Sequence, residues 1–203
     1  MIDAATGEVR QIDVPPRGTD SPFAVILSSR NRFYSHFGSV FMEFDPVSAG
    51  FTHAGQTGDR VAMSMTEDPN GRIWAATYPK SHLISYDPET RELVDSGPLN
   101  QENWPQYPRS VAAGRDGWVY MGIGNTRSHI IAYHPSTHRV VPIATAEERL
   151  PGAGSVLTAA DGTGYGRPNP KGPWFELRDG SRVAEVAKAP PAAPIRADRK
   201  SVV

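Results

Sequence analysis

The sequence predicts an all-β fold, a partial β-propeller of about four four-stranded blades plus one extra N-terminal strand. Three observations carry this prediction: a phrase that recurs every 42 to 47 residues, tight-turn dipeptides, and short apolar runs rich in β-branched and aromatic residues. Helical repeats of similar length need long apolar patterns with a 3.6-residue period. The sequence contains no such pattern, so strands are favoured throughout.

The repeated phrase is an apolar run followed by Asp-Pro, or a variant of it, and a short polar turn. Its copies lie at Asp3, Asp45, Asp87 and His134, with a degenerate copy near Arg178. The steps between them are 42, 42, 47 and 44 residues, which is the usual length of a propeller blade. We interpret the Asp residues as turn formers and not as catalytic carboxylates, because Asp in such turns accepts local backbone hydrogen bonds.

Each period divides into four short strands, A to D. The expected strands are 24–27, 33–35, 40–44 and 51–54 in the first blade (20–56), then 61–65, 73–77, 83–86 and 93–95 in the second (57–98). In the third blade (108–143) they are 111–113, 119–123, 130–133 and 140–143, and in the fourth (153–186) they are 155–158, 163–166, 174–177 and 183–186. Asn-Gly and Asp-Gly pairs, which tolerate positive φ, join strands A and B of the last three blades.

Both ends of the chain are expected to be incomplete. Residues 1–186 would form the partial propeller, in which residues 1–15 are the last strand of a blade whose other strands are missing. Residues 187–203 form a Pro- and Ala-rich tail, and the last six residues, 198–203, match the translation of a common sequencing-adapter read. Truncated arrays leave apolar blade faces uncovered, so we expect a chain of this extent to associate with itself.

Composition excludes several classes of function. The net charge is −1, which gives no electrostatic reason to expect nucleic acid or an acidic membrane as a partner. The chain has no cysteine, so disulfides, thiolate catalysis and Cys-based zinc sites are ruled out. No apolar stretch approaches the roughly 18–20 residues of a membrane span. No signal peptide, nucleotide-binding loop or catalytic motif is found, and no cofactor or metal is expected.

The connections from strand D to A and from strand B to C share one face of a propeller, and here they vary most. We expect this face to be cationic and to bind an anionic ligand, because loops presented by a rigid scaffold carry function. The candidates for catalysis are Tyr78, His82, Arg109 and Arg127. The candidates for substrate binding are His36, Arg60, Lys80, Trp104, Tyr107, Asn125 and His129.

Structural interpretations stand beside these functional ones. Trp104 and Tyr107, in the long connection 100–108, could stack on a sugar ring or only pack that loop. His82 and His129 each follow a serine and open a strand, so repeat equivalence alone explains them as residues that hydrogen-bond between blades. Arg60 and Arg109 are expected to match in register, each bracing a neighbouring blade or pointing into the channel mouth.

Two segments carry a family resemblance: GRIWAATYPKSHLISYDPETRELVDSGP (71–98) and DGWVYMGIGNTRSHIIAYHPSTHRVVPI (116–143). They resemble bacterial propellers of the broad WD40/YVTN-like group, and within it uncharacterised relatives of propeller-type polysaccharide lyases. The resemblance implies a secreted or periplasmic protein. It also implies β-elimination on uronate-containing chains, in which Arg or His neutralises the carboxylate and His or Tyr removes the C5 proton. No catalytic motif of that family is matched residue by residue.

Two hypotheses of function follow. In the first, the propeller binds or eliminates an acidic polysaccharide, with Arg109 and Arg127 as neutralisers and Tyr78 or His82 as the group that transfers the proton. In the second, the same face is a non-catalytic scaffold that holds a protein or peptide, with Trp104 and Tyr107 as anchors. A metal-dependent propeller is disfavoured, because the expected inner strands carry mostly Val, Ala, Met, Ser and Thr.

Overall fold

The structure, a computed structural model, describes residues 1–16, 20–189 and 191–193. These residues form four separate four-stranded antiparallel sheets, with the strand orders β1–β4, β5–β8, β9–β12 and β13–β16. The predicted fold class, an all-β partial propeller of four blades, is therefore confirmed. In the described part of the chain no helix is long and apolar enough to cross a membrane. Of the predicted Pro- and Ala-rich tail, 187–203, residues 190 and 194–203 lie outside the described residues.

The strands match the expected pattern closely. Blade 1 contains β1 (Val25–Leu27), β2 (Phe33–Phe37), β3 (Val40–Asp45) and β4 (Gly50–Gln56), and blade 2 contains β5 (Val61–Glu67), β6 (Ile73–Tyr78), β7 (His82–Asp87) and β8 (Glu92–Pro98). Blade 3 contains β9 (Tyr107–Ala113), β10 (Val119–Gly124), β11 (His129–His134) and β12 (Arg139–Pro142), and blade 4 contains β13 (Ser155–Thr158), β14 (Gly164–Arg167), β15 (Trp174–Arg178) and β16 (Ser181–Val186).

The Asp residues of the repeated phrase form turns, as predicted. The Asp87 carboxylate accepts hydrogen bonds from the backbone N–H groups of Glu89 and Thr90, at 2.9 and 3.3 Å. Asp68, in the turn between β5 and β6 at the same end of the blade, accepts from the N–H of Asn70 at 2.9 Å. Gly71, at the end of that turn, has a φ of 86°, which L side chains rarely adopt. The local chemistry of these residues therefore closes hairpins.

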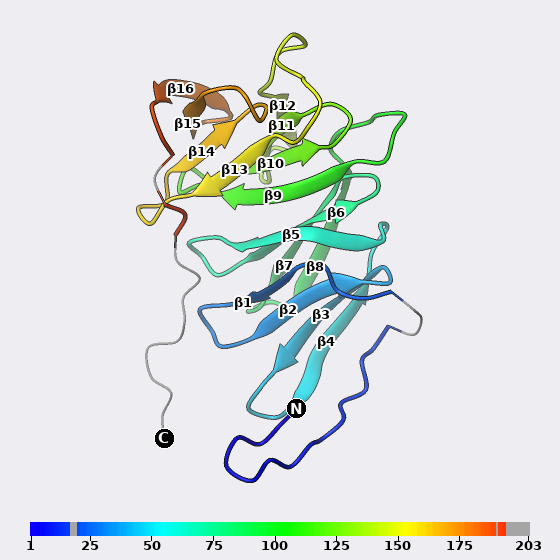
Figure 1. Ribbon diagram of the computed structural model, residues 1–203. Coiled ribbons are helices and arrows are strands. Elements are labelled where there is room, and N and C mark those ends of the chain that lie inside the picture. The colour runs from blue at the N-terminus through cyan, green and yellow to red at the C-terminus, as the bar shows by residue number, and fades with distance from the viewer. Residues whose placement is uncertain (17–19, 190, 194–203) are drawn as a thin grey trace.

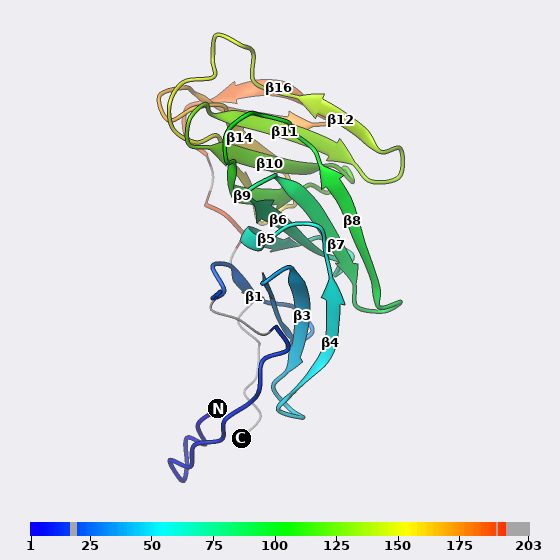
Figure 2. The same cartoon turned by 90° about the vertical axis from the view of Figure 1, so that its right-hand side faces the viewer.

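The blades are stacked face against face in an arc. The innermost strands β1, β5, β9 and β13 lie in a row on one side, and β4, β8 and β12 lie on the opposite side (Figures 1 and 2). Three clusters of buried side chains fill the spaces between successive blades. Each cluster draws on two blades, so every internal blade buries both of its faces against its neighbours.

Hydroxyl side chains join the inner strands to one another. Ser64 on β5 donates to the carbonyl of Pro108 on β9 at 2.8 Å, and Thr158 on β13 donates to the carbonyl of Ala113 at 3.2 Å. The row of inner strands lines a cavity of about 600 Å³, to which β1, β5, β9 and β13 all contribute. This cavity corresponds to the central channel expected of a propeller.

The N-terminal segment differs from the expected extra strand. Residues 1–15 form no sheet and contain one isolated bridge, between Ile2 and Val9. Asp3 still makes its turn, because its carboxylate accepts the N–H groups of Ala5 and Thr6 at 2.8 and 2.9 Å. The turn chemistry is thus present without the neighbouring strands that would extend it into a sheet.

Candidate functional site

Arg109 stands at a β-bulge in β9, beside the mouth of the channel cavity. Ser110 pairs with Gly122 and Pro108 pairs with Ile123, so Arg109 between them has no partner in the ladder. Bulges re-aim side chains and are frequent beside functional sites. The exposed Arg109 lines the channel cavity. Its guanidinium carbon lies 5.3 Å from the ring centroid of Tyr107, and its Nε donates to Oδ1 of Asn125 at 3.3 Å.

Two tyrosines pack together beside this arginine. The rings of Tyr78, at the end of β6, and Tyr107, at the start of β9, have centroids 4.7 Å apart and are tilted by 39°. The hydrogen bond to Tyr107 raises the pKa of Tyr78 above its ordinary value, and burial raises it further. Tyr78 is therefore a neutral phenol at neutral pH, suited to stacking and to donating a hydrogen bond.

Arg60 completes the group, which we call the channel-mouth cluster: Arg60, Tyr78, Tyr107, Arg109 and Asn125. The Arg60 N–H donates to the carbonyl of Tyr78 at 3.2 Å. Its guanidinium forms a bidentate pair with the Asp20 carboxylate, at 2.6 and 3.2 Å. The hydrogen bond to Arg60 lowers the pKa of Asp20, so the pair is ionised and the charge of Arg60 is largely compensated.

Three other cations of this face keep their charge open to solvent. Lys80, Arg109 and Arg127 are exposed and form no ion pair with a carboxylate of the described residues. Arg127 instead donates to the carbonyl of Ala146 at 3.2 Å. Uncompensated cations beside a concave surface attract anions, so the electrostatics of the face accord with an anionic ligand.

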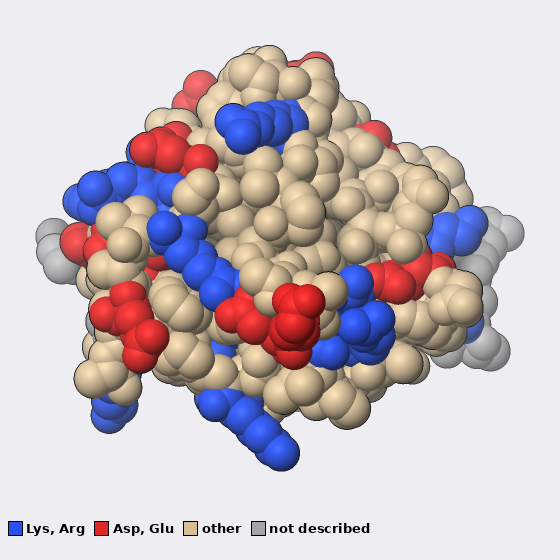
Figure 3. All heavy atoms as spheres, turned by 90° about the horizontal axis from the view of Figure 1, so that it is seen from above, with Lys and Arg blue, Asp and Glu red and all other residues tan. Residues whose placement is uncertain are grey.

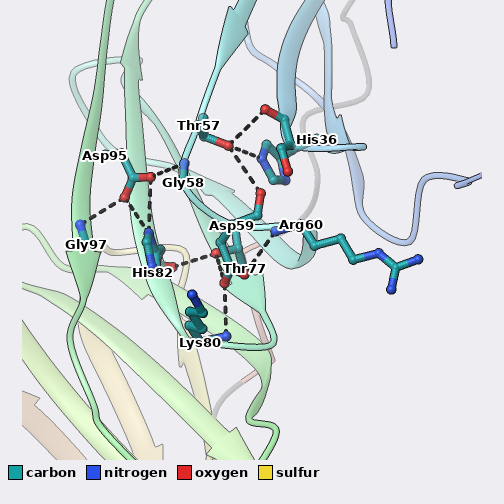
Figure 4. A network of polar contacts seen from close by, with 11 residues as sticks. His36, Thr57, Gly58, Asp59, Arg60, Thr77, Lys80, His82, Asp95 and Gly97 are labelled. Carbon is teal, nitrogen blue, oxygen red and sulfur yellow. Dashed lines mark hydrogen bonds and ion pairs between the residues drawn. The ribbon is translucent and has the colours of Figure 1, made fainter. Parts of the chain in front are cut away.

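A buried carboxylate fixes the backbone beneath the cluster (Figure 4). Asp59 accepts hydrogen bonds from the N–H of Arg60 at 2.9 Å, the hydroxyl of Thr77 at 2.9 Å and the N–H of Lys80 at 3.1 Å. It therefore ties the connection between blades 1 and 2 to the connection that follows Tyr78. Asp59 acts as a positioning residue for the cluster, and it is too buried to meet a ligand.

The three candidate histidines lie below the surface, which corrects their assignment as ligand-contacting residues. His36 is fully buried, with Nε2 2.7 Å from Oγ1 of Thr57, and burial lowers its pKa to about 4. His129 is also buried, and burial, followed by the nearby charge of Arg149, lowers its pKa to about 4. Neutral buried imidazoles of this kind are structural. The expected hydrogen bond of His129 between blades is not found among the described residues, where its Nδ1 has no partner.

His82 hydrogen-bonds within its own blade, so the expected direct bond between blades is wrong. Its Nδ1 lies 2.9 Å from the Asp95 carboxylate on β8. The link between blades comes through Asp95, which also accepts the N–H of Gly58 from the preceding connection at 2.7 Å (Figure 4). Burial acts to raise the pKa of Asp95, but the N–H groups of Gly58 and Gly97 and the His82 ring outweigh it and leave the pKa lowered.

Two further expectations need correction. Trp104 is half-buried and packs against the core between blades 2 and 3, so it packs its loop and does not present a flat face to the mouth. Arg60 and Arg109 do not occupy equivalent positions in their blades. Ser64 on β5 and Ser110 on β9 are equivalent in the two ladders, and Arg109 comes one residue before Ser110, whereas Arg60 comes four residues before Ser64. Tyr107 and Arg109 belong to strand β9, not to the connection before it.

Sequence reasoning missed two carboxylates of this face, Asp20 and Asp95. Asp20 lies in a connection without a counterpart in the other repeats, and Asp95 meets His82 only through the pairing of β7 with β8. The pattern of a histidine opening one strand and an acid in the next could have indicated the second pair. Among the described residues no group of three or more His, Asp or Glu side chains is arranged to hold a metal ion.

Comparison with known proteins supports the fold alone. No protein-family model matches the chain, and no curated protein matches its sequence. A streptogramin B lyase structure superimposes with a TM-score of 0.62 at 15% identity, covering 94% of this chain and 61% of that one. The virginiamycin B lyase of Staphylococcus aureus gives 0.59 at 11% identity, covering 81% and 54%. The extracellular domain of a hybrid two-component system from B. thetaiotaomicron gives 0.54 at 14% identity, covering 74% and 22%.

These solved structures are β-propeller-like, in agreement with the four stacked sheets. The chain spans between 22% and 61% of their length. Nothing in the comparisons supports the narrower resemblance to the WD40/YVTN-like group or to polysaccharide lyases, because no family model matches.

Proposed function

We propose that the chain is a ligand-binding propeller whose channel-mouth cluster binds the anionic groups of an acidic polysaccharide. One observation carries the proposal. Arg109 is lifted out of its ladder by a bulge and holds its guanidinium over Tyr107 at the edge of the channel cavity, and no carboxylate of the described residues neutralises it. A guanidinium presented in this way is suited to bidentate recognition of a carboxylate or sulfate group.

The neighbouring groups suit a sugar chain. The packed rings of Tyr78 and Tyr107 supply aromatic groups with phenol hydroxyls beside Arg109, a combination that suits sugar rings. The cavity of about 600 Å³ next to Arg109 has the size of a small-molecule site and is open enough to admit part of a polymer. Exposed Lys80 and Arg127 on the same face attract further anionic units of such a chain.

Binding without turnover is the function that the geometry favours. Of the two candidates for proton transfer, His82 is buried against Asp95, and Tyr78 has a raised pKa. A phenol with a raised pKa is a poor base, because its deprotonated form is scarce at neutral pH. Structures of lyases are among those that resemble this chain, so β-elimination is tested alongside binding. The alternative, a protein-binding scaffold, loses one of its two expected anchors, because Trp104 packs inward, and keeps the other, Tyr107.

The test is calorimetric titration with polygalacturonate and with heparin at low ionic strength, with neutral dextran as the ligand control. We expect Arg109→Ala to weaken binding about tenfold or more, since a charge-assisted hydrogen bond contributes roughly 1.5–3 kcal/mol. The matched control is Arg115→Ala. Arg115 is an exposed arginine at the opposite end of the same inner strand, lines the same cavity and donates to the carbonyl of Asp161.

Equal losses in the two variants would show that only net charge matters and would overturn the site. Equal affinity for dextran would overturn the anionic ligand. The ultraviolet absorbance of unsaturated uronates is followed in the same samples. A rise in absorbance with the wild-type chain would replace binding by elimination as the function of the site.

A further inference from the structure

The faces of successive blades are equivalent in register, which allows a direct comparison of their burial. We call the face of a blade that turns toward the preceding blade its incoming face, and the opposite one its outgoing face. In blade 2 the incoming face carries Ile73, which pairs with Tyr86, and in blade 3 it carries Val119, which pairs with Tyr133. The corresponding pair in blade 1 is Phe33 with Phe44.

Among the described residues, no blade covers the incoming face of blade 1. Ile73 is 0% exposed and Val119 is 2% exposed, whereas Phe33 is 38% exposed and Val25 on the adjacent strand is 57% exposed. The face holds an almost wholly apolar groove of about 280 Å³, whose lining includes Val14, Pro22, Val25, Phe33, Phe44 and Phe51. The segment that precedes β1 contributes Val14 and Pro22 and covers only part of the groove.

The outgoing face of blade 4 is the matching surface. Tyr165 pairs with Glu176 there, as Tyr34 pairs with Glu43 on the outgoing face of blade 1, which docks on blade 2. Beside this pair, the guanidinium of Arg167 lies over the ring of Trp174, and its carbon is 5.3 Å from the ring centroid. The Nε of Arg167 is buried without a hydrogen-bond partner among the described residues. Seen from above, over blade 4, the middle of this surface is largely uncharged, with acidic and basic side chains around its margin (Figure 3).

We propose that a second copy of this chain covers both faces. The incoming face of blade 1 in one copy docks on the outgoing face of blade 4 in the other, and the reciprocal contact closes a ring of eight blades. The docking repeats the heterologous interface that the chain already forms three times between its own blades. Propellers close with 4–8 blades, and a head-to-tail interface that closes leaves no apolar face free.

The assembly is independent of the proposed ligand, because the two faces lie on the flat sides of the blades and the channel-mouth cluster lies at the strand ends. The first experiment is sedimentation equilibrium of the full chain, whose mass is 22.1 kDa. We expect a species of twice this mass. We expect two variants to convert the dimer to monomer: Phe33→Asp on the incoming face and Trp174→Asp on the outgoing face. Each interface contains one face of each kind, so either substitution would bury a charged carboxylate in both interfaces of the dimer.

Mixing the two variants provides the decisive measurement. One interface in the mixed pair joins an intact incoming face to an intact outgoing face, so the mixture is expected to recover a two-chain species that neither variant forms alone. Val47→Asp is the matched control, because Val47 is 81% exposed in the turn after β3, away from both faces. Circular dichroism and thermal melting check that each variant folds, and Val25→Asp replaces Phe33→Asp where that variant fails.

A monomeric wild-type chain at micromolar concentration would overturn the proposal. So would a Trp174→Asp variant that stays dimeric, because it would show that two incoming faces pair symmetrically. Open assemblies larger than two chains would show that the head-to-tail contact does not close and would overturn the ring.

Discussion

Blades 2 and 3 place the same histidine in two different surroundings. His82 and His129 both open the third strand of their blade, at β7 and β11. In blade 2 the residue opposite Ile84 is Asp95, which bonds the His82 ring. In blade 3 the residue opposite the equivalent Ile131 is Pro142, and Nδ1 of His129 is buried with no partner in the described part of the chain.

The difference shows what a repeat does and does not specify. The apolar positions and turns of the repeat set the strands, whereas the polar partners of each blade are set separately. In blade 2, Asp95 bonds both the His82 ring and the N–H of Gly58, so it ties this corner of the blade to the connection between blades 1 and 2; we call this arrangement the clamp. The blade 3 corner has no such clamp, and an ion pair between Glu102 and Arg149 spans the loops beside it. The channel-mouth cluster lies where blades 2 and 3 meet, between these unlike corners.

Removal of the clamp is expected to give the largest effect. Asp95→Ala leaves His82 and the N–H groups of Gly58 and Gly97 without their acceptor, so we expect it to lower the free energy of unfolding by about 2 kcal/mol. Pro142→Ala at the equivalent position removes no hydrogen bond, and we expect it to change stability by less than about 1 kcal/mol. Urea unfolding followed by circular dichroism measures both variants. Equal losses would show that the two corners are energetically alike.

The unpartnered histidine is expected to make stability depend on pH. The pKa of His129 is about 4 in the folded chain and about 6.5 when unfolded, so the unfolded state binds a proton first as the pH falls. Stability is therefore complete above pH 6.5 and decreases toward pH 4, by about 2 kcal/mol for this group at pH 5. His36, with a pKa also of about 4, contributes in the same sense.

His129→Gln isolates the contribution of blade 3. We expect the variant to lose a large part of the dependence of unfolding free energy on pH between pH 7 and pH 5, and to keep the part that His36 and His53 supply, since burial lowers the pKa of both. His138→Gln, at an exposed histidine in the turn before β12, is the matched control for the loss of an imidazole outside the buried core. A variant with the full wild-type profile would show that His129 is protonated without cost in the folded chain.

The sequence was sufficient for the fold because the features that define it are local. The Asp-Pro and Asn-Gly turns close on themselves, as Asp87 and Asp68 do, and the strands between them follow from their apolar and β-branched residues. The faces of the blades follow from the alternation along each strand. None of this depends on which blade packs against which, so one sequence with a clear period predicts it.

The site was predicted only in part, because its geometry depends on pairing between strands. Arg109 and Tyr107 could be assigned to the correct end of the blade, but only the ladder of β9 with β10 shows the bulge at which Arg109 stands. The ion pair of Arg60 with Asp20 joins residues 40 positions apart, and no repeat carries that acid. The burial of His36 likewise depends on the sheet and connection around it, which no local pattern reveals.

The smallest expected effect comes from giving blade 3 the carboxylate of blade 2. Pro142→Asp places an acid opposite Ile131, where Asp95 stands opposite Ile84, and we expect it to raise the pKa of His129 from about 4 by roughly one unit. Arg149 and Arg127, which act to lower this pKa, limit the rise, and Glu102 acts in the opposite sense. Titration of the imidazole proton by NMR measures it. Pro142→Asn is the control, because it removes the proline ring without adding a charge. An equal rise of the His129 pKa in both variants would mean that the loss of the proline causes the change, and that a carboxylate opposite Ile131 does not act on the histidine.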